Sequence, residues 1–356
     1  QRQIDSSAFR TTPESLMGSS GVFIQKTNHG GGSPFIRGLT GNQTLILIDG
    51  IRMNNSTFRY GPNQYLNTID MFTIDKIEVA KGIGAIEFGS DAMGGVINLS
   101  TKENEYSSRP IIHASTLGKF ISSNMEQTSR SEISFSNAGI AIQGGLSFRN
   151  FGNLKGGGNV GVQNPTGYNE NNIELKVKLK ITKQDEIIIA TQNTIQHNVP
   201  IYHKLILENY RINEVEKQAR NLNYVKYKHV NNNKWFAEFL VTASTQRTIE
   251  QRSLQKINST IHRNEADTVH TIGMTSEIIS KPTKFWTFNT GFDYYQDNIY
   301  SSAKELNQQT NTTEFKRGLY PNAAKYNNSS LFNLHHFQLG RLFIETGLRY
   351  NFLKIN

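Results

Sequence analysis

The side chains best suited to binding a small molecule lie in two polar segments near the start of the chain. One is "NNSTFRYGPNQY" (54–65) and the other is "TNHGGGSP" (27–34). Aromatic rings can stack on a ligand, an arginine can pair with an anionic group, and amides or an imidazole can donate or accept hydrogen bonds. The residues that offer this chemistry are His29, Asn55, Phe58, Arg59, Tyr60, Asn63, Gln64 and Tyr65. The alternative is solvated turn chemistry, in which Gly, Pro and Asn are expected anyway.

Enzymatic chemistry finds little support in the sequence. The segment "GIGAIEFG" (82–89) lacks the third glycine of a dinucleotide-binding loop, and no phosphate-binding lysine motif is present. Neither His335-His336 nor the pair His197 and His203 has the spacing of a zinc-binding helix, and the chain contains no cysteine. No Ser/His/Asp combination can be singled out. We therefore expect no enzyme, no cofactor and no metal site, with a membrane-barrel hydrolase as an alternative.

Composition and charge limit the possible classes of protein. Of the 356 residues 36% are hydrophobic, and no apolar run approaches the roughly 18 to 20 residues of a membrane-spanning helix. The net charge is +9, yet residues 1–102 carry 9 basic and 8 acidic side chains, so the basic surplus lies further along the chain. There it is dispersed among acidic residues instead of forming a basic patch, so we expect no nucleic-acid partner.

The second part of the chain is a series of alternating segments. In "IELKVKLKI" (173–181) every apolar residue falls on one face of a strand and every charged residue on the other. The predicted strands lie near 109–118, 128–137, 139–151, 171–182, 185–196, 221–231, 234–247, 267–280, 283–299, 325–336 and 339–352. Several reach the length that a tilted strand needs to cross a membrane.

The connections between these strands alternate in length. Short connections lie near 136–139, 182–185, 231–234, 280–284 and 335–338, and long polar ones span 152–170, 197–220, 248–266 and 300–324. Short turns on one rim and long loops on the other are typical of an outer-membrane barrel with its short turns in the periplasm. An aromatic-rich soluble sheet is the alternative.

The first part of the chain reads as a small α+β domain with tight turns. "TLILIDGIRM" (44–53) predicts a buried strand, a turn at Asp49-Gly50 and a return strand. "IDKIEVAKG" (74–82) and "GGVINLSTK" (94–102) predict two more strands.

Four motifs in this region resemble the plug domain of TonB-dependent outer-membrane receptors. They are Ile36-Arg37-Gly38, Leu47-Ile48-Asp49-Gly50-Ile51-Arg52, Ile77-Glu78-Val79-Ala80-Lys81-Gly82 and Phe88-Gly89-Ser90-Asp91-Ala92-Met93-Gly94-Gly95-Val96-Ile97-Asn98. The resemblance implies a membrane all-β barrel of about 22 strands with an N-terminal α+β plug in its lumen. We expect a plug at 1–102 and, at 103–356, the N-terminal portion of the barrel, because about eleven strands cannot enclose such a plug.

The resemblance also implies a location and a function. The protein would bind a scarce nutrient outside the outer membrane of a Gram-negative cell, with a ferric siderophore or similar chelate as the best guess. It would then import the nutrient with energy supplied by a TonB-type protein, although no TonB box is recognisable before Thr12. Further partners would be outer-membrane lipid or lipopolysaccharide and a possible outer-membrane lipoprotein. The alternative is a plugged barrel that serves as a structural or assembly subunit without transport of its own.

Site residues follow from the same resemblance. The segments 27–34 and 54–65 match plug loops that face the outside, so their polar and aromatic side chains are expected to contact substrate. The positions expected to shape or gate the plug are Arg37, Gly38, Asp49, Gly50, Arg52, Glu78, Lys81, Gly82, Glu87, Gly89, Gly94 and Gly95. Among them Arg37, Glu78, Lys81 and Glu87 are expected to pair with charges of the barrel wall; plain salt bridges that hold the plug are the alternative.

Overall fold

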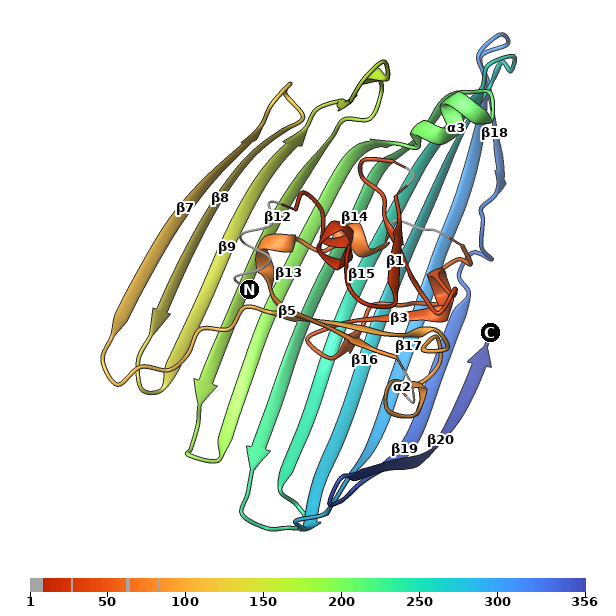
Figure 1. Ribbon diagram of the computed structural model, residues 1–356. Coiled ribbons are helices and arrows are strands. Elements are labelled where there is room, and N and C mark those ends of the chain that lie inside the picture. Colours follow the sequence, from red (N-terminus) through yellow and green to blue (C-terminus); the bar gives the residue numbers. More distant parts are fainter. Residues whose placement is uncertain (1–8, 27, 62–64, 82–83) are drawn as a thin grey trace.

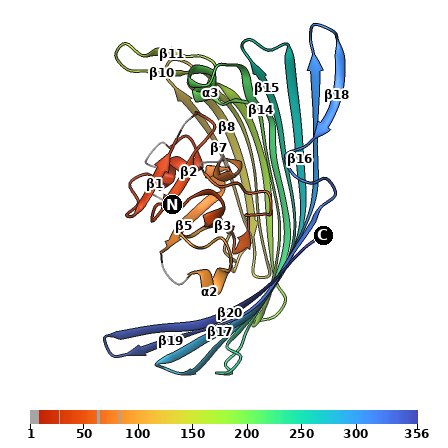
Figure 2. The same cartoon turned by 90° about the vertical axis from the view of Figure 1, so that its right-hand side faces the viewer.

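The computed structural model describes residues 9–26, 28–61, 65–81 and 84–356. The described residues up to Thr101 form a small mixed unit, and those from Ile111 onward form a long, curved, antiparallel sheet (Figure 1). The small unit lies against the concave face of the sheet (Figure 2). We call the small unit the plug and the sheet the wall.

The plug contains a four-stranded sheet with the order β4-β3-β6-β5. Strand β3 pairs in parallel with β6, whereas β4 and β5 run antiparallel to their neighbours. All five residues of β3 are buried, so the strand is uniformly apolar after its first residue instead of alternating. The strands are β3 (Thr44–Ile48), β4 (Ile51–Arg52), β5 (Ile74–Ala80) and β6 (Gly95–Thr101).

The other plug elements are short. A separate antiparallel pair joins β1 and β2, and the 3-10 helix η4 is capped by Asp70, whose carboxylate accepts a hydrogen bond from the Phe72 N–H. The elements are η1 (Thr12–Leu16), β1 (Val22–Gln25), β2 (Ser33–Ile36), η2 (Gly41–Gln43), η3 (Tyr65–Thr68), η4 (Met71–Thr73) and α2 (Gly84–Phe88).

The predicted hairpin of the plug is confirmed. Asp49 (φ 52°) and Gly50 (φ 79°) both adopt left-handed backbone conformations between β3 and β4. Two positive φ angles in succession are what a two-residue hairpin turn of the favoured twist requires, and Asp-Gly is among the few pairs that adopt them readily.

The wall contains eleven strands that follow one another as antiparallel neighbours from β7 to β20, with β18 added beside β17. The eleven predicted strands are therefore confirmed. They are β7 (Ile111–Ile121), β8 (Glu126–Ser136), β9 (Ile140–Phe151), β12 (Tyr168–Lys180), β13 (Asp185–Pro200), β14 (Tyr210–Val230), β15 (Glu238–Lys256), β16 (Ile261–Thr283), β17 (Trp286–Asn307), β19 (Lys325–Leu339) and β20 (Leu342–Ile355). In the part of the chain that the structure describes, the sheet is open, with β7 and β20 at its edges (Figure 2).

The predicted long loops are partly wrong. Strands β14 to β17 extend well into the segments 197–220, 248–266 and 300–324, and β15 and β16 are joined by a tight turn at 257–260. The reason is that these extensions are held by cross-strand ion pairs, which leave no apolar alternation to detect. Arg252 faces Glu265 across β15 and β16, and the two side chains form an ion pair of 2.8 Å.

The remaining loops on this rim carry small elements of their own. They are β10 (Leu154–Gly156), β11 (Gly161–Gln163), α3 (Tyr202–Leu207) and β18 (Thr312–Arg317). All four lie at the same end of the wall in Figures 1 and 2, opposite the short turns. The connections on this rim are therefore longer than those on the opposite rim, as predicted, although the difference in length is smaller than expected.

Strand β12 has the two faces that its sequence predicts. On one side Ile173 is 55% exposed, whereas on the other Lys176 is 6% exposed and contacts the plug. Glu174 also points inward, since it pairs with Arg130 of β8. No helix among the described residues is long and apolar enough to span a membrane.

Plug and wall share one apolar core. Buried plug residues such as Ile46 and Leu99 belong to the same cluster as Leu222 and Tyr224 of β14. The plug sheet ends at Thr101 and β7 begins at Ile111, and the division at residue 102 stays a prediction.

Candidate functional site

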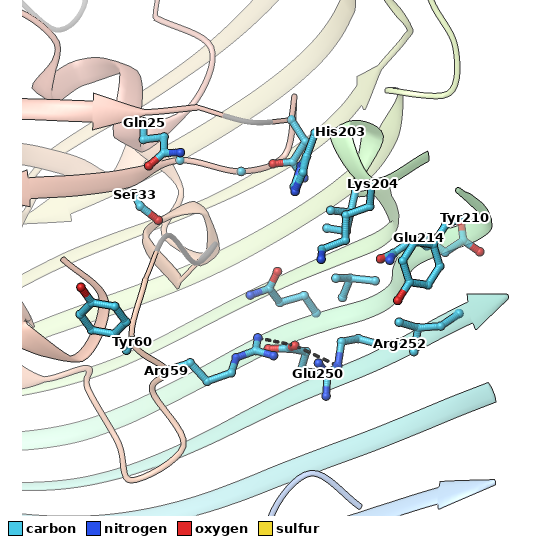
Figure 3. A pocket seen from close by; sticks show the side chains of 18 residues that line it. Gln25, Ser33, Arg59, Tyr60, His203, Lys204, Tyr210, Glu214, Glu250 and Arg252 are labelled. Carbon is cyan, nitrogen blue, oxygen red and sulfur yellow. Dashed lines mark hydrogen bonds and ion pairs between the residues drawn. The ribbon is translucent and has the colours of Figure 1, made fainter. Parts of the chain in front are cut away.

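A polar cavity of about 480 Å³ lies between the plug and the wall, toward the rim that carries α3 (Figure 3). The plug contributes residues from β1, the segment before β2 and the segment after β4, and the wall contributes residues from α3, β14 and β15. The lining residues are Gln25, Asn28, Gly31, Gly32, Ser33, Arg59, Tyr60, Ile201, His203, Lys204, Tyr210, Asn213, Glu214, Val215, Gln218, Glu250, Arg252 and Leu254.

Two arginines meet at one carboxylate in this cavity. Arg59 of the plug pairs with Glu250 of β15 at 2.8 Å, and Arg252 approaches the same oxygen at 3.3 Å. Burial lowers the pKa of Arg59, but Glu250 and the Tyr65 hydroxyl more than compensate and raise it above its ordinary value. Arg59 is therefore a permanent cation that connects the plug to the wall at the edge of the cavity.

The three predicted aromatic platforms have different environments. Phe58 stacks on Tyr65 with ring centroids 3.7 Å apart, and Phe58 is buried. The Tyr65 oxygen accepts a hydrogen bond from the Arg59 N–H, so this pair of rings supports the loop from within. Tyr60 is 76% exposed and lines the cavity (Figure 3), which makes it the ring best placed to stack on a solute.

The predicted hydrogen-bonding residues are mostly engaged in the protein itself. Asn55 donates to the Thr248 hydroxyl at 3.1 Å and accepts from the Thr57 N–H at 3.0 Å. His29 is completely buried, and its ring packs edge-on against the stacked rings of Phe151 and Tyr168. A contact between His29 and a solute would require the plug or wall to move.

The state of the His29 imidazole follows from its position. Burial, followed by the positive charges of Lys26 and Arg10, lowers the pKa of His29 to about 3. The ring is therefore neutral at physiological pH. The predicted contacts Asn63 and Gln64 lie outside the described residues.

The wall half of the cavity was not predicted from the sequence. Lys204 and His203 come from α3, and Glu214, Glu250 and Arg252 come from the extended parts of β14 and β15. The sequence predicts loops for these stretches, and a predicted loop does not assign its side chains to an inner or outer face. The segment "IEQR" (249–252) offers one indication of a strand with a charged face, because Glu250 and Arg252 are two residues apart.

Among the predicted plug-motif residues, Asp49 is held by several hydrogen bonds and an ion pair. Its carboxylate accepts hydrogen bonds from the Thr101 N–H (2.8 Å) and the Tyr224 hydroxyl (2.8 Å), and Lys176 lies 3.4 Å away. Burial raises the pKa of Asp49, but Lys176 and these hydrogen bonds outweigh burial, and the pKa lies below its ordinary value. The Asp49 turn is thus held against β12 and β14 as a charged group.

Other motif residues shape the plug itself. Arg52 pairs with Asp91 and donates to the Ser90 hydroxyl at 3.0 Å. A Cβ at Gly95 would lie 2.6 Å from the Ala80 carbonyl oxygen, and a Cβ at Gly94 would lie 2.9 Å from that of Ile36, so both positions require glycine. Gly38 and Gly89 also have positive φ angles. Gly82 lies outside the described residues.

Among the described residues, three of the four plug charges expected to pair with the wall have partners within the plug. Arg37 donates to the Lys81 carbonyl, Glu78 pairs with Lys76, and the Lys81 ammonium donates to the Ser20 carbonyl. These groups lie in turns and on the outer edge of the plug sheet, so their partners are local.

Glu87 of α2 does approach the wall, but it meets acids. Burial, followed by the negative charges of Glu277 and Glu345, raises the pKa of Glu87 to about 7. Its backbone carbonyl accepts a hydrogen bond of 2.9 Å from Arg349 of β20.

A buried ion pair joins the plug to the wall at another place, and further ion pairs lie beside it within the wall. Asp70 pairs with Arg130 of β8 at 3.0 Å and accepts from the Ser147 hydroxyl at 2.7 Å. Beside it, Arg149 of β9 pairs with Glu126 at 3.0 Å and with Glu170 at 3.1 Å. These side chains are almost fully buried.

Comparison with known proteins supports the architecture. The model of the TonB-dependent Receptor Plug Domain matches residues 1–96. A vitamin B12 transporter of Vibrio vulnificus (strain CMCP6) is 35% identical over 108 residues, which cover 30% of this chain and 17% of the relative. The rhizobactin receptor of Rhizobium meliloti (strain 1021) is 32% identical over 107 residues, which cover 30% of this chain and 14% of the relative.

Solved structures match both the plug and the wall. The copper transporter OprC superposes with a TM-score of 0.80 at 15% identity, over 97% of this chain and 52% of its own. The unliganded ferric citrate transporter FecA gives 0.70 at 14% identity, over 97% of this chain and 54% of its own. At these identities the match shows the fold, and this chain spans about half the length of those structures.

Proposed function

Because this chain carries the plug and part of the barrel of a TonB-dependent outer-membrane receptor, we propose that it captures a scarce nutrient outside the cell and imports it. The import would draw on energy supplied through a TonB-type protein at the periplasmic face. The matched relatives named above are described as transporters and receptors, and this likeness supports the proposal.

The cavity at the plug–wall interface is the observation that carries this function. It lies toward the rim with the longer loops, which faces the outside in outer-membrane barrels. It is lined by the plug and by the wall, so a solute bound there contacts both parts. A volume of about 480 Å³ falls in the range typical of small-molecule sites.

The chemistry of the cavity favours a polar solute with anionic groups as the cargo. Arg59, Arg252 and Lys204 supply three cations. They pair with Glu250, Glu265 and Glu208 in the protein, and an anionic solute would compete with these carboxylates. Tyr60 adds an exposed ring, and amide and hydroxyl groups make up much of the remaining lining. Ferric siderophores and similar chelates are polar and often anionic, so this class of cargo agrees best with the cavity.

Uptake assays test the proposal. Cells expressing the complete gene are given, in separate assays, labelled ferric hydroxamate, ferric catecholate, cobalamin and copper, with and without a functional TonB-type protein. We expect saturable uptake of one ferric chelate that requires the coupling protein. Uptake of cobalamin or copper alone would overturn the assignment of the cargo, and the absence of saturable uptake of any solute would overturn transport.

Variants test the position of the site. Arg59→Ala and Tyr60→Ala should each weaken binding of the transported solute about tenfold or more. The matched control is Arg247→Ala, because Arg247 lies on the same strand as Glu250 but is exposed on the opposite face. Unchanged affinity in both cavity variants would remove the site from this cavity.

A further inference from the structure

Three arginines of the wall are buried against the plug, and they differ in their counter-charges. Arg130 pairs with Asp70, Glu132 and Glu174, and Arg149 pairs with Glu126 and Glu170. Arg220 of β14 is 1% exposed, yet no carboxylate of the described residues lies within 4.0 Å of its guanidinium.

The contacts of Arg220 are with neutral groups. Its Nε donates to the Thr68 carbonyl at 3.0 Å, and its Nη2 donates to the Gln192 side-chain oxygen at 3.1 Å. Its Nη1 is buried and has no hydrogen-bond partner among the residues that the structure describes. A guanidinium does not lose its proton in proteins, so Arg220 cannot relieve its own charge by becoming neutral.

The nearest acid is already balanced. Asp49 accepts a hydrogen bond of 3.4 Å from the same Gln192 amide, but its charge is paired with Lys176. Lys226 donates to the Asp49 carbonyl and adds a further positive charge to this region. A buried charge without a counter-charge is costly, and the cost falls when an opposite charge is bound beside it.

A small cavity next to Arg220 offers room for such a charge. It measures about 40 Å³ and is lined by Arg220 together with apolar groups of Phe58, Ala219 and Val269 and the Thr248 hydroxyl. One water-sized particle needs roughly 10 to 15 Å³ of such space, so a halide ion fits. The cavity is too small for a ferric chelate.

The acids that border this cavity are engaged elsewhere. Glu250 pairs with Arg59 and Arg252, and Asp267 pairs with Arg252 at 3.2 Å. Arg220 is therefore the charged group of the cavity that lacks a partner of opposite charge in the part of the chain described.

We propose that Arg220 binds a small monovalent anion of halide size, such as chloride, in this cavity. The anion would accept a hydrogen bond from Nη1 and supply the missing counter-charge. Since Arg220 also donates to Thr68 of the plug, the anion stabilises the contact between η3 and β14. The small cavity shares Gln218 and Glu250 with the solute cavity, so the anion lies next to the solute cavity.

Crystals of the purified receptor grown in bromide test the site directly. We expect an anomalous peak in contact with Arg220 Nη1 in the wild-type protein. A water molecule with no anomalous signal in that position would overturn the proposal. This arm needs no variant and so does not depend on whether a substitution folds.

Thermal unfolding in detergent gives a second readout. At constant ionic strength, replacing gluconate by chloride should raise the unfolding midpoint of the wild type by about 1 to 3 °C. Arg220→Met should abolish this rise, Arg220→Lys should retain part of it, and the exposed control Arg247→Met should keep all of it. A full chloride effect in Arg220→Met would contradict the site.

Discussion

The plug contacts the wall through two interfaces that differ in burial. The charged interface joins Asp70 of the plug to Arg130, with Arg149 and its two acids directly beside it. The cavity interface joins Arg59 to Glu250 beside the solute cavity, where the Arg59 side chain is 32% exposed. The charged interface excludes water, and the cavity interface is open to it.

This difference separates two tasks. Buried pairs are strongly destabilising to break, because the remaining charge has no solvent. A partly exposed pair can exchange its partner for water or for an anionic solute at little cost. We infer that the charged interface holds the plug in place, whereas the cavity interface can respond to the bound solute.

Breaking the charged interface should have the largest effect. Arg149→Met leaves Glu170 buried without a counter-charge and leaves Glu126 with Lys119 alone, and it should lower the free energy of unfolding by about 3 to 5 kcal/mol. Denaturant unfolding in detergent measures the change. Lys76→Met, which removes an exposed pair on β5, is the control and should leave stability nearly unchanged.

A rescue variant sharpens the same test. Adding Glu170→Gln to Arg149→Met should recover most of the lost stability, because the carboxylate that lost its counter-charge is then removed as well, and Glu126 keeps its pair with Lys119. If Arg149→Met alone were as mild as the control, the buried ion pairs of Arg149 beside Asp70 would not stabilise the charged interface.

The next effect concerns the outer face of the wall. Strand β12 presents one face to the plug, and its opposite, apolar face is expected to meet lipid. Val177→Lys should cost about 2 to 4 kcal/mol if the residue lies near the bilayer midplane. Lys178→Gln on the inner face should cost much less, because its partner Glu103 is partly exposed. Equal costs, measured by unfolding in lipid vesicles, would contradict this orientation.

The strands of the wall could be predicted because a period of two survives wherever one face is apolar. In β12, for example, the exposed apolar residues Ile173 and Leu175 alternate with charged residues and so predict the strand. The end of β15 and the start of β16 could not be predicted, because ion pairs such as Arg252 with Glu265 stabilise them through contacts between strands. Such contacts depend on register, which the sequence does not state.

The plug side of the cavity could be predicted for a related reason. The loop around Arg59 and Tyr60 is one continuous segment, so its composition alone indicates binding chemistry. Glu250 and Lys204 come from separate wall elements and meet the loop only in the folded protein. The burial of His29 could not be predicted, because the sequence shows its polarity but not the two aromatic rings that pack against it.

A smaller effect is expected from α2, where the plug meets the wall through like charges. The pKa of Glu87 is raised from 4.5 to about 7, so the folded protein binds more protons than the unfolded chain between these values. Stability should therefore fall by about 1 to 2 kcal/mol as the pH rises from 5 to 8. Thermal unfolding of Glu87→Gln should lack this component of the pH dependence. An unchanged profile would show that Glu87 titrates normally.

The smallest effect should come from the cavity interface itself. A double-mutant cycle of Arg59→Ala and Glu250→Ala should give a coupling free energy of only about 0.2 to 1 kcal/mol in unfolding, because the pair is partly exposed. The same cycle on Asp70 and Arg130 should give a larger value, since both side chains are buried. Bound solute should reduce the first coupling further, because the solute competes with Glu250 for Arg59, and should leave the second unchanged. If both couplings were equal, or if solute changed both alike, the two interfaces would act as a single unit, and the separation of anchoring from binding would fail.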